Sequence, residues 1–419
     1  MLELVISVIG LTILLGFFGN VLFQRTSIPN TLWLLVFGMG LGALGFVGAD
    51  FIASAAGLMG AIAIIGILSD GGLHLDLKHV VKEGFLGSLL MFTGLLGTTG
   101  GIVILLGVWN IPLPIALFIA IALAGTSASV VIPIVQSLSF VSDKLKTILS
   151  IEAISDTFSI VVALFMIDFL LSPGTPLSGA DGVVRGVVLE FLSAISIGII
   201  FGLVWGPFIG KLKRYDYSYA ATLGALILLY AFAELFGSSG AIAVFTAGIM
   251  LANAHLIYHA LFPEFTFGRL DEDVSKTHSL FAFLIRVFFF VFLGMVVGIP
   301  EIDYLIIGAA TTAIIVGTRF IYINLFIRLK LLHFHGNEKM LTYFMIPRGL
   351  SAAVLAVFAL ASGVAYGEAI VQIIFSVIIF TILLTTLATF SLRDRGTKTN
   401  PEMLQPMKPL AAGTAPTFD

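Results

Sequence analysis

The sequence has no cysteine and few charged residues. None of its 419 residues is cysteine, and only 11% are Asp, Glu, Lys or Arg. The missing cysteine excludes disulfide bonds, thiolate metal sites and cysteine nucleophiles. A soluble domain carries about 25% charged residues, whereas 59% of this chain is hydrophobic, so the composition predicts a protein embedded in a lipid bilayer. The formal net charge of −3 is too small to favour a nucleic-acid partner.

Long apolar runs occupy most of the chain. A membrane-spanning helix needs roughly 20 apolar residues, and proline, glycine or charged residues separate thirteen runs of this kind. The first run has Glu3 ahead of it and no basic segment, and it exceeds the core of a signal peptide, so we interpret it as a retained span. The predicted spans are residues 2–23, 30–48, 51–69, 84–107, 113–138, 145–171, 183–209, 217–236, 240–256, 278–298, 303–328, 340–361 and 367–391.

Basic residues concentrate in alternate loops. All but four of the 21 Lys and Arg residues fall on one side of the predicted membrane, in loops or in the tail at 392–419. By the positive-inside rule, the amino terminus lies outside and the tail is cytoplasmic, which predicts a multi-pass protein of the plasma membrane. The tail is rich in Pro, Thr and Ala, and we expect it to be disordered. The four exceptions are Arg185, Arg286, Arg319 and Arg348.

Two predicted spans contain proline beside small or hydroxyl residues. The fifth contains AGTSASVVIPIV, from Ala124 to Val135, and the twelfth contains YFMIPRGLSAAVLA, from Tyr343 to Ala356. Proline interrupts helical hydrogen bonding, and irregular backbone at membrane depth is tolerated only where it is buried in protein or lines an aqueous cavity. For one such site alone, an ordinary kink is an equally good interpretation.

The positions of the two breaks favour a transporter. If residues 1–171 and 217–391 are two repeats joined by a linker helix at 183–209, each break falls on the fifth helix of its repeat. The repeats then enter the membrane from opposite sides, as in secondary transporters with inverted repeats. No sequence similarity joins the halves, so this inference depends on hydropathy and position. We predict an all-α polytopic membrane protein with one transport domain over residues 1–391.

Two carboxylates lie inside the sixth predicted span. Glu152 and Asp156 are four residues apart, which predicts one shared helix face, although a charge at the bilayer centre costs about 2.5–3.5 kcal/mol. Hard cations such as Na⁺ prefer carboxylate, hydroxyl and carbonyl oxygens. A buried carboxylate binds either a proton or a cation, and this competition allows one to be exchanged for the other. The nearby hydroxyl residues are Thr126, Ser127, Ser129, Ser155 and Ser159.

Arg348, directly after Pro347 in the second break, needs a carboxylate partner if it is buried. Asp70, in GILSDGGLHLDL at the end of the third span, and Glu152 are the two candidates. The structural alternatives are an Asp70 in interfacial water and a Glu152 that only pairs with Arg348. Two further arginines, Arg286 and Arg319, lie nearer span ends, where we expect them to snorkel and to have structural roles.

Two weaker signals are also present. All seven histidines fall in or beside the basic loops, where they are either interfacial residues or a cytoplasmic pH sensor. The spacing from Gly38 to Gly42 permits close helix packing, but the chain has 44 glycines and such spacings arise by chance.

Five motifs resemble those of the monovalent cation:proton antiporters, on the NhaP-type sodium/proton exchanger side of that superfamily. LSDGGLHLDL is similar to the third-helix acidic motif, AGTSASVVIP to the unwound helix, and IEAISDTF to the glutamate … asparagine–aspartate signature; FLIRVFFFVFLGM and MIPRGLSAAVLA resemble two later motifs. The chain departs from the pattern at Ser127, where many relatives carry aspartate, and at Ser155, where they carry asparagine. The spacing from Glu152 to Asp156 is four rather than the more common five.

The resemblance implies an elevator-like, alternating-access exchanger of Na⁺, with K⁺ and Li⁺ as alternatives, for protons. It also implies a homodimer without a cofactor and without an enzymatic reaction. Asp156 would bind the ion and the proton, surrounded by Thr126, Ser127, Ser155 and Glu152, and Arg348 would pair with Asp70 or Glu152. One clear carrier carboxylate favours electroneutral one-for-one exchange.

Other classes of protein stay open at this point. A sodium-coupled symporter of an organic solute on a related broken-helix fold predicts a roomy cavity with aromatic or basic contacts, whereas the breaks offer small hydroxyl residues. A channel needs a pore open to both sides of the membrane. An intramembrane hydrolase needs a base near Ser127 or Ser155, and no histidine lies mid-span. The sequence does not identify the physiological cation, the direction of flux or the pH regulation.

Overall fold

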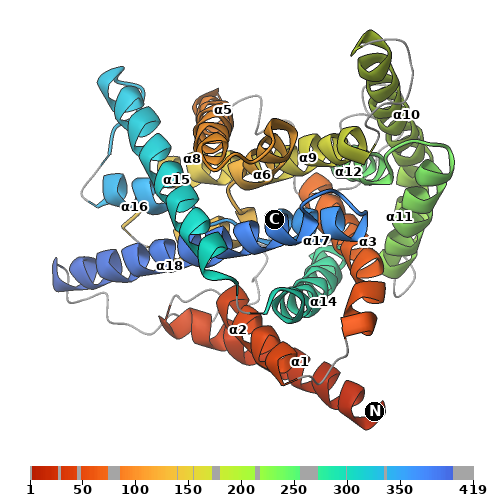
Figure 1. The fold of residues 1–419 in the computed structure, drawn as a ribbon, viewed down its shortest axis with the longest axis horizontal. Coiled ribbons are helices and arrows are strands. Elements are labelled where there is room, and N and C mark those ends of the chain that lie inside the picture. The colour runs from red at the N-terminus through yellow and green to blue at the C-terminus, as the bar shows by residue number, and fades with distance from the viewer. Residues whose placement is uncertain are drawn as a thin grey trace, which may run out of the picture.

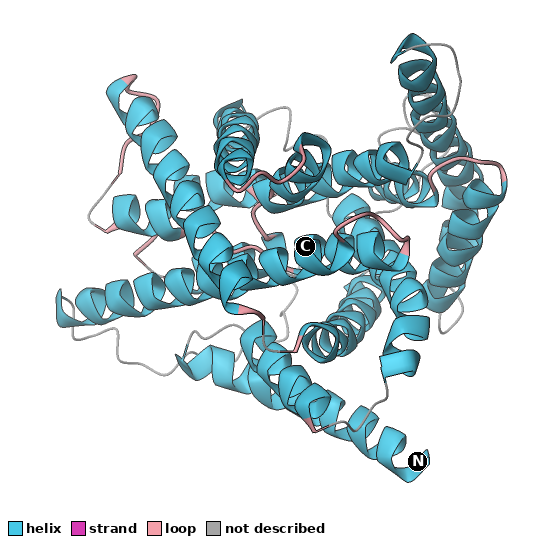
Figure 2. Ribbon diagram, viewed as in Figure 1, coloured by secondary structure: helices cyan, strands magenta, loops and turns pink. Residues whose placement is uncertain are grey.

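The computed structural model describes eleven stretches of the chain, and every regular element in them is an α-helix (Figure 2). The predicted all-α class is therefore confirmed. The described residues are 2–26, 30–44, 49–73, 85–138, 140–153, 155–171, 180–212, 218–254, 272–298, 300–334 and 337–399.

Each of the thirteen predicted spans coincides with one helix or with two consecutive helices in the described residues. Five helical stretches are long and apolar enough to cross a bilayer, judged by length and composition, and eight further apolar helices are shorter. The helices are α1 (Leu2–Thr26), α2 (Asn30–Ala43), α3 (Ala49–Leu73), α5 (Phe85–Val108), α6 (Leu113–Ala124), α7 (Ala128–Ser137), α8 (Asp143–Glu152), α9 (Ser155–Leu171), α10 (Ala180–Leu212), α11 (Ser218–Leu235), α12 (Gly240–Ala252), α14 (Glu272–Val297), α15 (Ile302–Arg328), α16 (Glu338–Phe344), α17 (Leu350–Ala361) and α18 (Gly367–Thr399).

Three predicted spans are interrupted. The fifth is divided into α6 and α7 and the twelfth into α16 and α17, as predicted, although Pro133 of the fifth span lies inside α7 and not at the break. The sixth span also consists of two helices, because α8 ends at Glu152 and α9 begins at Ser155. At the carboxyl end, α18 continues to Thr399, eight residues past the predicted boundary, and residues 400–419 of the predicted disordered tail lie outside the described residues.

The helices form two groups (Figure 1). The broken-helix bundle consists of α5, α6, α7, α8, α9, α15, α16, α17 and α18, and the continuous-helix bundle of α1, α2, α3, α10, α11, α12 and α14. Most helix pairs pack within one of these bundles, and the main contact between the bundles joins α17 to α3. In Figure 1, α17 and α18 cross the middle of the view between α5, α6 and α9 on one side and α3 and α14 on the other.

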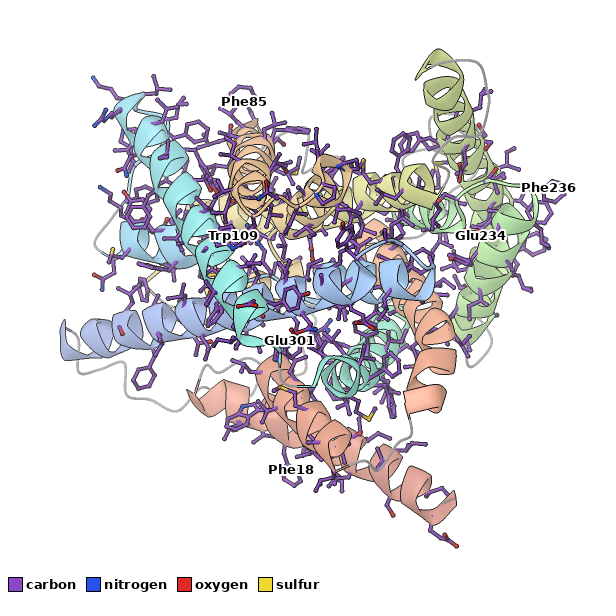
Figure 3. The ribbon with its side chains drawn as sticks, in the orientation of Figure 1. Phe18, Phe85, Trp109, Glu234, Phe236 and Glu301 are labelled. Carbon is purple, nitrogen blue, oxygen red and sulfur yellow. The ribbon has the colours of Figure 1, made fainter. Side chains whose placement is uncertain are left out.

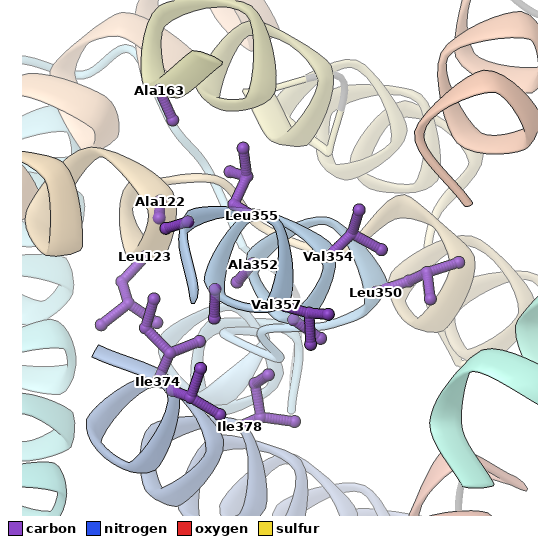
Figure 4. Packing of buried hydrophobic residues seen from close by; sticks show 14 of the residues in the cluster. Ala122, Leu123, Ala163, Leu350, Ala352, Val354, Leu355, Val357, Ile374 and Ile378 are labelled. Atoms are coloured by element: carbon purple, nitrogen blue, oxygen red, sulfur yellow. The ribbon is translucent and has the colours of Figure 1, made fainter. Parts of the chain in front are cut away.

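Helix α17 lies at the centre of the apolar core. Its Leu355, fully buried, points toward Ala163 of α9 and lies beside Ala122 of α6, while Ile374 and Ile378 of α18 lie on its other side (Figure 4). The small residues of α17, LSAAVLAVFALA, leave room for three neighbouring helices at once. This packing places the residues just before α17, in the second break, against the first break.

Glycines bring the backbones of the continuous-helix bundle close together. Gly38 of α2 faces Gly294 of α14: a Cβ at Gly294 would lie 2.9 Å from the Gly38 Cα. In the same way, Gly72 of α3 faces Gly248 of α12, where a Cβ at Gly248 would lie 3.1 Å from the Gly72 Cα. The first contact joins the second helix of repeat one to the third helix of repeat two, and the second contact joins the third helix of repeat one to the second helix of repeat two. This exchange is expected of two repeats related by a two-fold axis. The spacing from Gly38 to Gly42 therefore does serve close packing.

Large apolar side chains cover the outside of the molecule. Phe18, Phe85 and Phe236 project from its edge (Figure 3), with 60%, 78% and 68% of their surface exposed. Exposed apolar patches of this extent are unusual in soluble monomers. They agree with helices surrounded by lipid.

Candidate functional site

The two breaks meet, and their backbones are joined directly. The Ser127 N–H donates a 2.9 Å hydrogen bond to the Pro347 carbonyl oxygen. Gly349 permits this approach, since a Cβ there would collide with the Ser127 side chain. Irregular backbone inside a membrane protein must find hydrogen-bond partners within the protein. The crossing satisfies part of this requirement from within.

Hydroxyl groups on neighbouring helices satisfy other freed backbone groups. The Thr126 N–H donates to Ser155 Oγ over 3.0 Å, and the Arg348 N–H donates to Thr381 Oγ1 over 3.1 Å. At the end of α16, the Phe344 carbonyl oxygen accepts a 2.8 Å bond from Thr385 Oγ1. These side chains come from α9 and α18, so both helices hold the two breaks in place.

Arg348 connects the second break to the first. Its Nη1 donates to the Gly125 carbonyl oxygen and to Thr126 Oγ1, both over 2.8 Å, and the side chain is 3% exposed. Gly125 directly follows the last residue of α6, so the guanidinium lies at a helix carboxyl end, where positive charge is favourable. Among the described residues, the printed partners of the Arg348 guanidinium are thus neutral oxygens, while the predicted pairing with Asp70 concerns a side chain outside the described residues.

Asp156 lies on the first turn of α9, beside the first break. A Cβ at Gly125 would lie 2.7 Å from the Asp156 Cα, so only glycine allows the break to approach α9 this closely. The groups nearest to the Asp156 carboxylate in electrostatic terms are the Ser351 hydroxyl and the Arg348 guanidinium. Asp156 is half-buried, whereas its neighbour Ser155 is buried, and it forms no ion pair among the described residues. The carboxylate therefore has no ion-pair partner among the described residues.

Glu152 has such a partner, and it is Arg319 of α15. The two side chains form a bidentate pair in which Arg319 Nη1 contacts Glu152 Oε1 and Arg319 Nη2 donates to Glu152 Oε2 over 3.0 Å. Tyr322 donates its hydroxyl to Glu152 Oε1 over 3.2 Å and accepts a 2.6 Å bond from Arg319 Nη1. Arg319 Nε also donates to the Thr342 carbonyl oxygen. All of these charged atoms are buried and satisfied.

The structure brings together most of the predicted site residues. Thr126, Ser127, Ser155 and Arg348 all lie at the crossing of the breaks, close to Asp156. The Asp70 side chain lies outside the described residues, as does that of Ser129. Of the seven histidines, only the exposed His333 has a described side chain.

Three expectations from the sequence are corrected. Glu152 and Asp156 do not share a face of one helix, because α8 ends at Glu152 before α9 begins, and the two carboxylates meet different partners. The buried partner of Glu152 is Arg319 and not Arg348. Arg319 does not snorkel: it is 2% exposed.

Sequence reasoning did not assign roles to Tyr322 and Ser351. The signal for Tyr322 was its position three residues after Arg319 on one helix, which places both on the same face. Ser351 lies inside the motif MIPRGLSAAVLA, but nothing in the sequence distinguishes it from the other hydroxyl residues.

This arrangement offers one free carboxylate among hydroxyl and carbonyl oxygens, beside one arginine. The chain has no cysteine thiolate, and hard cations prefer oxygen. A carboxylate of this kind binds a proton or a small cation. When neither a proton nor a cation is bound, the neighbouring positive charge of Arg348 stabilises the ionised carboxylate.

Comparison with known proteins identifies a family. A family model described as sodium/hydrogen exchanger, transmembrane, matches residues 10–392. The low-affinity Na(+)/H(+) antiporter NhaS1 of Synechocystis sp. is 27% identical over 378 residues, covering 87% of this chain and 68% of that protein. The K(+)/H(+) antiporter NhaP of Alkalimonas amylolytica is 26% identical over 379 residues, covering 87% of this chain and 62% of that protein. The chain thus spans about two thirds of the length of these two relatives.

A solved structure has the same fold. The sodium proton antiporter MjNhaP1 from Methanocaldococcus jannaschii, determined at pH 8, superposes with a TM-score of 0.70 and 21% sequence identity. The match covers 93% of this chain and 97% of MjNhaP1. The sodium/proton antiporter fold implied by the family resemblance is therefore confirmed.

Proposed function

Because this chain belongs to the sodium/hydrogen exchanger family, we infer that it is a monovalent cation/proton antiporter, and we propose that Asp156 binds the cation and the proton in turn. One observation carries the assignment to Asp156. Its carboxylate lies at the crossing of the breaks and is in no ion pair among the described residues, whereas Glu152 is held by Arg319 and Tyr322. Glu152 consequently has a structural role in this proposal and does not bind the ion.

Competition at one carboxylate performs the exchange. A proton and a cation both neutralise Asp156, so one leaves when the other binds. Arg348 makes release possible, because it balances the charge of the empty carboxylate without occupying its oxygen atoms. Removing that balance would leave an isolated buried charge, which costs several kcal/mol.

The charges of the buried residues favour electroneutral exchange. Among the described charged residues at the crossing of the breaks, Glu152 and Arg319 cancel each other, which leaves Asp156 and Arg348. The site is neutral when Asp156 is ionised, and it carries one positive charge when Asp156 holds either a proton or a monovalent cation. Both loaded forms have the same charge, so one-for-one exchange moves no net charge across the membrane.

The two bundles suggest how access alternates. The broken-helix bundle contains the complete site, and its contact with the continuous-helix bundle is formed mainly by apolar residues of α17 and α3. A site held in one bundle can move past the other without being dismantled. We include in the proposal Na⁺ as the first cation, a homodimer, and an amino terminus outside the cell; these rest on the resemblance and on the basic loops.

The test uses purified protein in vesicles with an imposed pH gradient. Na⁺, K⁺ and Li⁺ are added in turn, and dissipation of the gradient and current are recorded. We expect cation-dependent dissipation without current in the wild type, and its loss in Asp156→Asn. The matched control is Asp143→Asn, which removes an exposed carboxylate at the start of α8 and keeps exchange. Exchange that persists in Asp156→Asn contradicts the assignment of the carrier, and a wild type that conducts current without moving protons contradicts antiport.

A further inference from the structure

Two buried hydroxyl groups beside Asp156 are not engaged elsewhere. Ser159 lies one turn after Asp156 on α9, and its Oγ, in a side chain 2% exposed, has no hydrogen-bond partner. Ser351 lies on the first turn of α17 and is also 2% exposed. Its hydroxyl lies beside the Asp156 carboxylate, and its Oγ has no hydrogen-bond partner among the described residues. Buried polar atoms normally have a hydrogen-bond partner, so these two hydroxyl groups are available to bind a ligand.

The hydroxyl groups that the sequence motifs indicate are already in use. Ser155 Oγ accepts the Thr126 N–H, and Thr126 Oγ1 accepts from Arg348. Each keeps only one of its two lone pairs for a further partner. Thr126 also lies against the Arg348 guanidinium, whose positive charge repels a cation. A cation at Asp156 therefore needs oxygen ligands from other residues.

We propose that Ser351 and Ser159 are ligands of the transported cation, with Ser351 as the contribution of the second repeat. The proposal rests on the proposed function, since it adds ligands to the same Asp156 site. Ser159 lies on the side of the first break, where a Cβ at Gly125 would come within 2.8 Å of its Oγ. Ser351 approaches the carboxylate from α17. The two hydroxyl groups thus flank Asp156 from different helices.

A serine hydroxyl suits all three states of the carboxyl group. It donates a hydrogen bond to the ionised carboxylate, accepts one from the protonated form, and presents its oxygen to a cation by rotating about one bond. No backbone movement is needed. Removing the hydroxyl should weaken cation binding more than proton binding, because the proton needs only the carboxylate.

The experiment measures the apparent KM for Na⁺, Li⁺ and K⁺ and the maximal rate in reconstituted vesicles. For Ser351→Ala we expect a KM raised about fivefold to tenfold for the preferred cation, the size of one lost hydrogen bond or ligand, with altered ratios between the cations. For Ser159→Ala we expect a change in the same direction. Ser351→Thr keeps a hydroxyl and should restore the wild-type KM. Ser376→Ala is the control, because Ser376 is a fully buried serine of α18 that bonds only the Gln372 carbonyl oxygen.

The outcomes separate this proposal from the proposed function. Suppose that the wild type exchanges and that Asp156→Asn abolishes exchange. Unchanged KM values and unchanged cation ratios in both alanine variants would then overturn the proposal that the serines are ligands and leave the proposed function in place. A fall in maximal rate at constant KM, shared with Ser376→Ala, also overturns them, since it indicates a packing defect. If the wild type itself lacks cation-dependent proton movement, both proposals fail.

Discussion

The broken-helix bundle and the continuous-helix bundle are both helical and apolar, but they bury different groups. The buried charged side chains among the described residues all belong to the broken-helix bundle, and they are Glu152, Arg319, Glu338 and Arg348. The continuous-helix bundle instead brings backbones together at facing glycines, Gly38 with Gly294 and Gly72 with Gly248.

This difference places the buried charged groups in one bundle and the close backbone packing in the other. Buried charge requires many simultaneous partners, and each partner fixes another helix in place, as Arg319 does for α8, α15 and α16. Glycine contacts require only that two helix surfaces fit closely, and they hold the two helices together without polar groups. In the proposed mechanism, the first bundle therefore holds the ion site, and the second is the surface against which it moves.

The largest expected effect is the loss of one partner of the Glu152–Arg319 pair. Glu152→Gln or Arg319→Met leaves an uncompensated buried group, and we expect a loss of about 3–5 kcal/mol of stability. The double variant Glu152→Gln/Arg319→Met should cost less than either single change. The measurement is thermal unfolding of the purified protein in detergent.

An exposed ion pair provides the control. Lys146 and Asp143 lie 3.6 Å apart on the surface of α8, and Asp143→Asn should not shift the unfolding midpoint, because surface pairs contribute little. If the double variant is as unstable as the sum of the single ones, the pair does not act as a unit and the contrast between the bundles weakens.

The next effect concerns the glycine contacts. Gly38→Ala places a Cβ against the Val291 carbonyl oxygen and the Gly294 Cα, and overpacking of this kind costs about 1–3 kcal/mol. Because Gly38 belongs to the continuous-helix bundle, the apparent KM for the cation should stay at the wild-type value. Unfolding and transport are measured on the same preparation.

Gly40, two residues later on the same helix, is the matched control. A Cβ there meets no atom within 4 Å, and alanine is a better helix former than glycine by about 0.5–1 kcal/mol, so Gly40→Ala should be neutral or slightly stabilising. A raised KM in Gly38→Ala would show that the two bundles are not separate in function.

The smallest expected effect is that of Tyr322→Phe. The change removes one hydroxyl that bonds Arg319 and Glu152 but leaves their bidentate pair in place. The expected loss of stability is about 1 kcal/mol, with exchange retained. Tyr366→Phe, at an exposed position before α18, is the control and should have no effect. A loss as large as that of Arg319→Met would mean that the tyrosine holds the pair together.

Much of the fold follows from local sequence. The spans were predictable because a bilayer requires apolar runs of a fixed length, and the breaks at α6–α7 and α16–α17 because proline and glycine interrupt helices. The interruption between Glu152 and Ser155 was not, since IEAIS contains neither residue. The end of α18 was also missed: its last turns are polar, and helices can continue past the membrane into water.

The site was predicted less completely than the spans. Asp156, Thr126, Ser155 and Arg348, which the structure places together, were predicted because charged and hydroxyl residues are rare in apolar helices. The partner of Glu152 was not, because Arg319 lies 167 residues away and a lone arginine near a span end is equally compatible with snorkelling.

The sequence alone determined that this chain is a membrane protein, where its helices run, where two of them break, and which acids lie within the spans. Those properties depend on composition and on short-range geometry. Only the tertiary structure decided which acid is held and which is free, since that depends on which arginine each meets across the bundle. A charge in an apolar interior is stabilised by whatever partner packing brings to it, and packing joins residues that are distant in the chain.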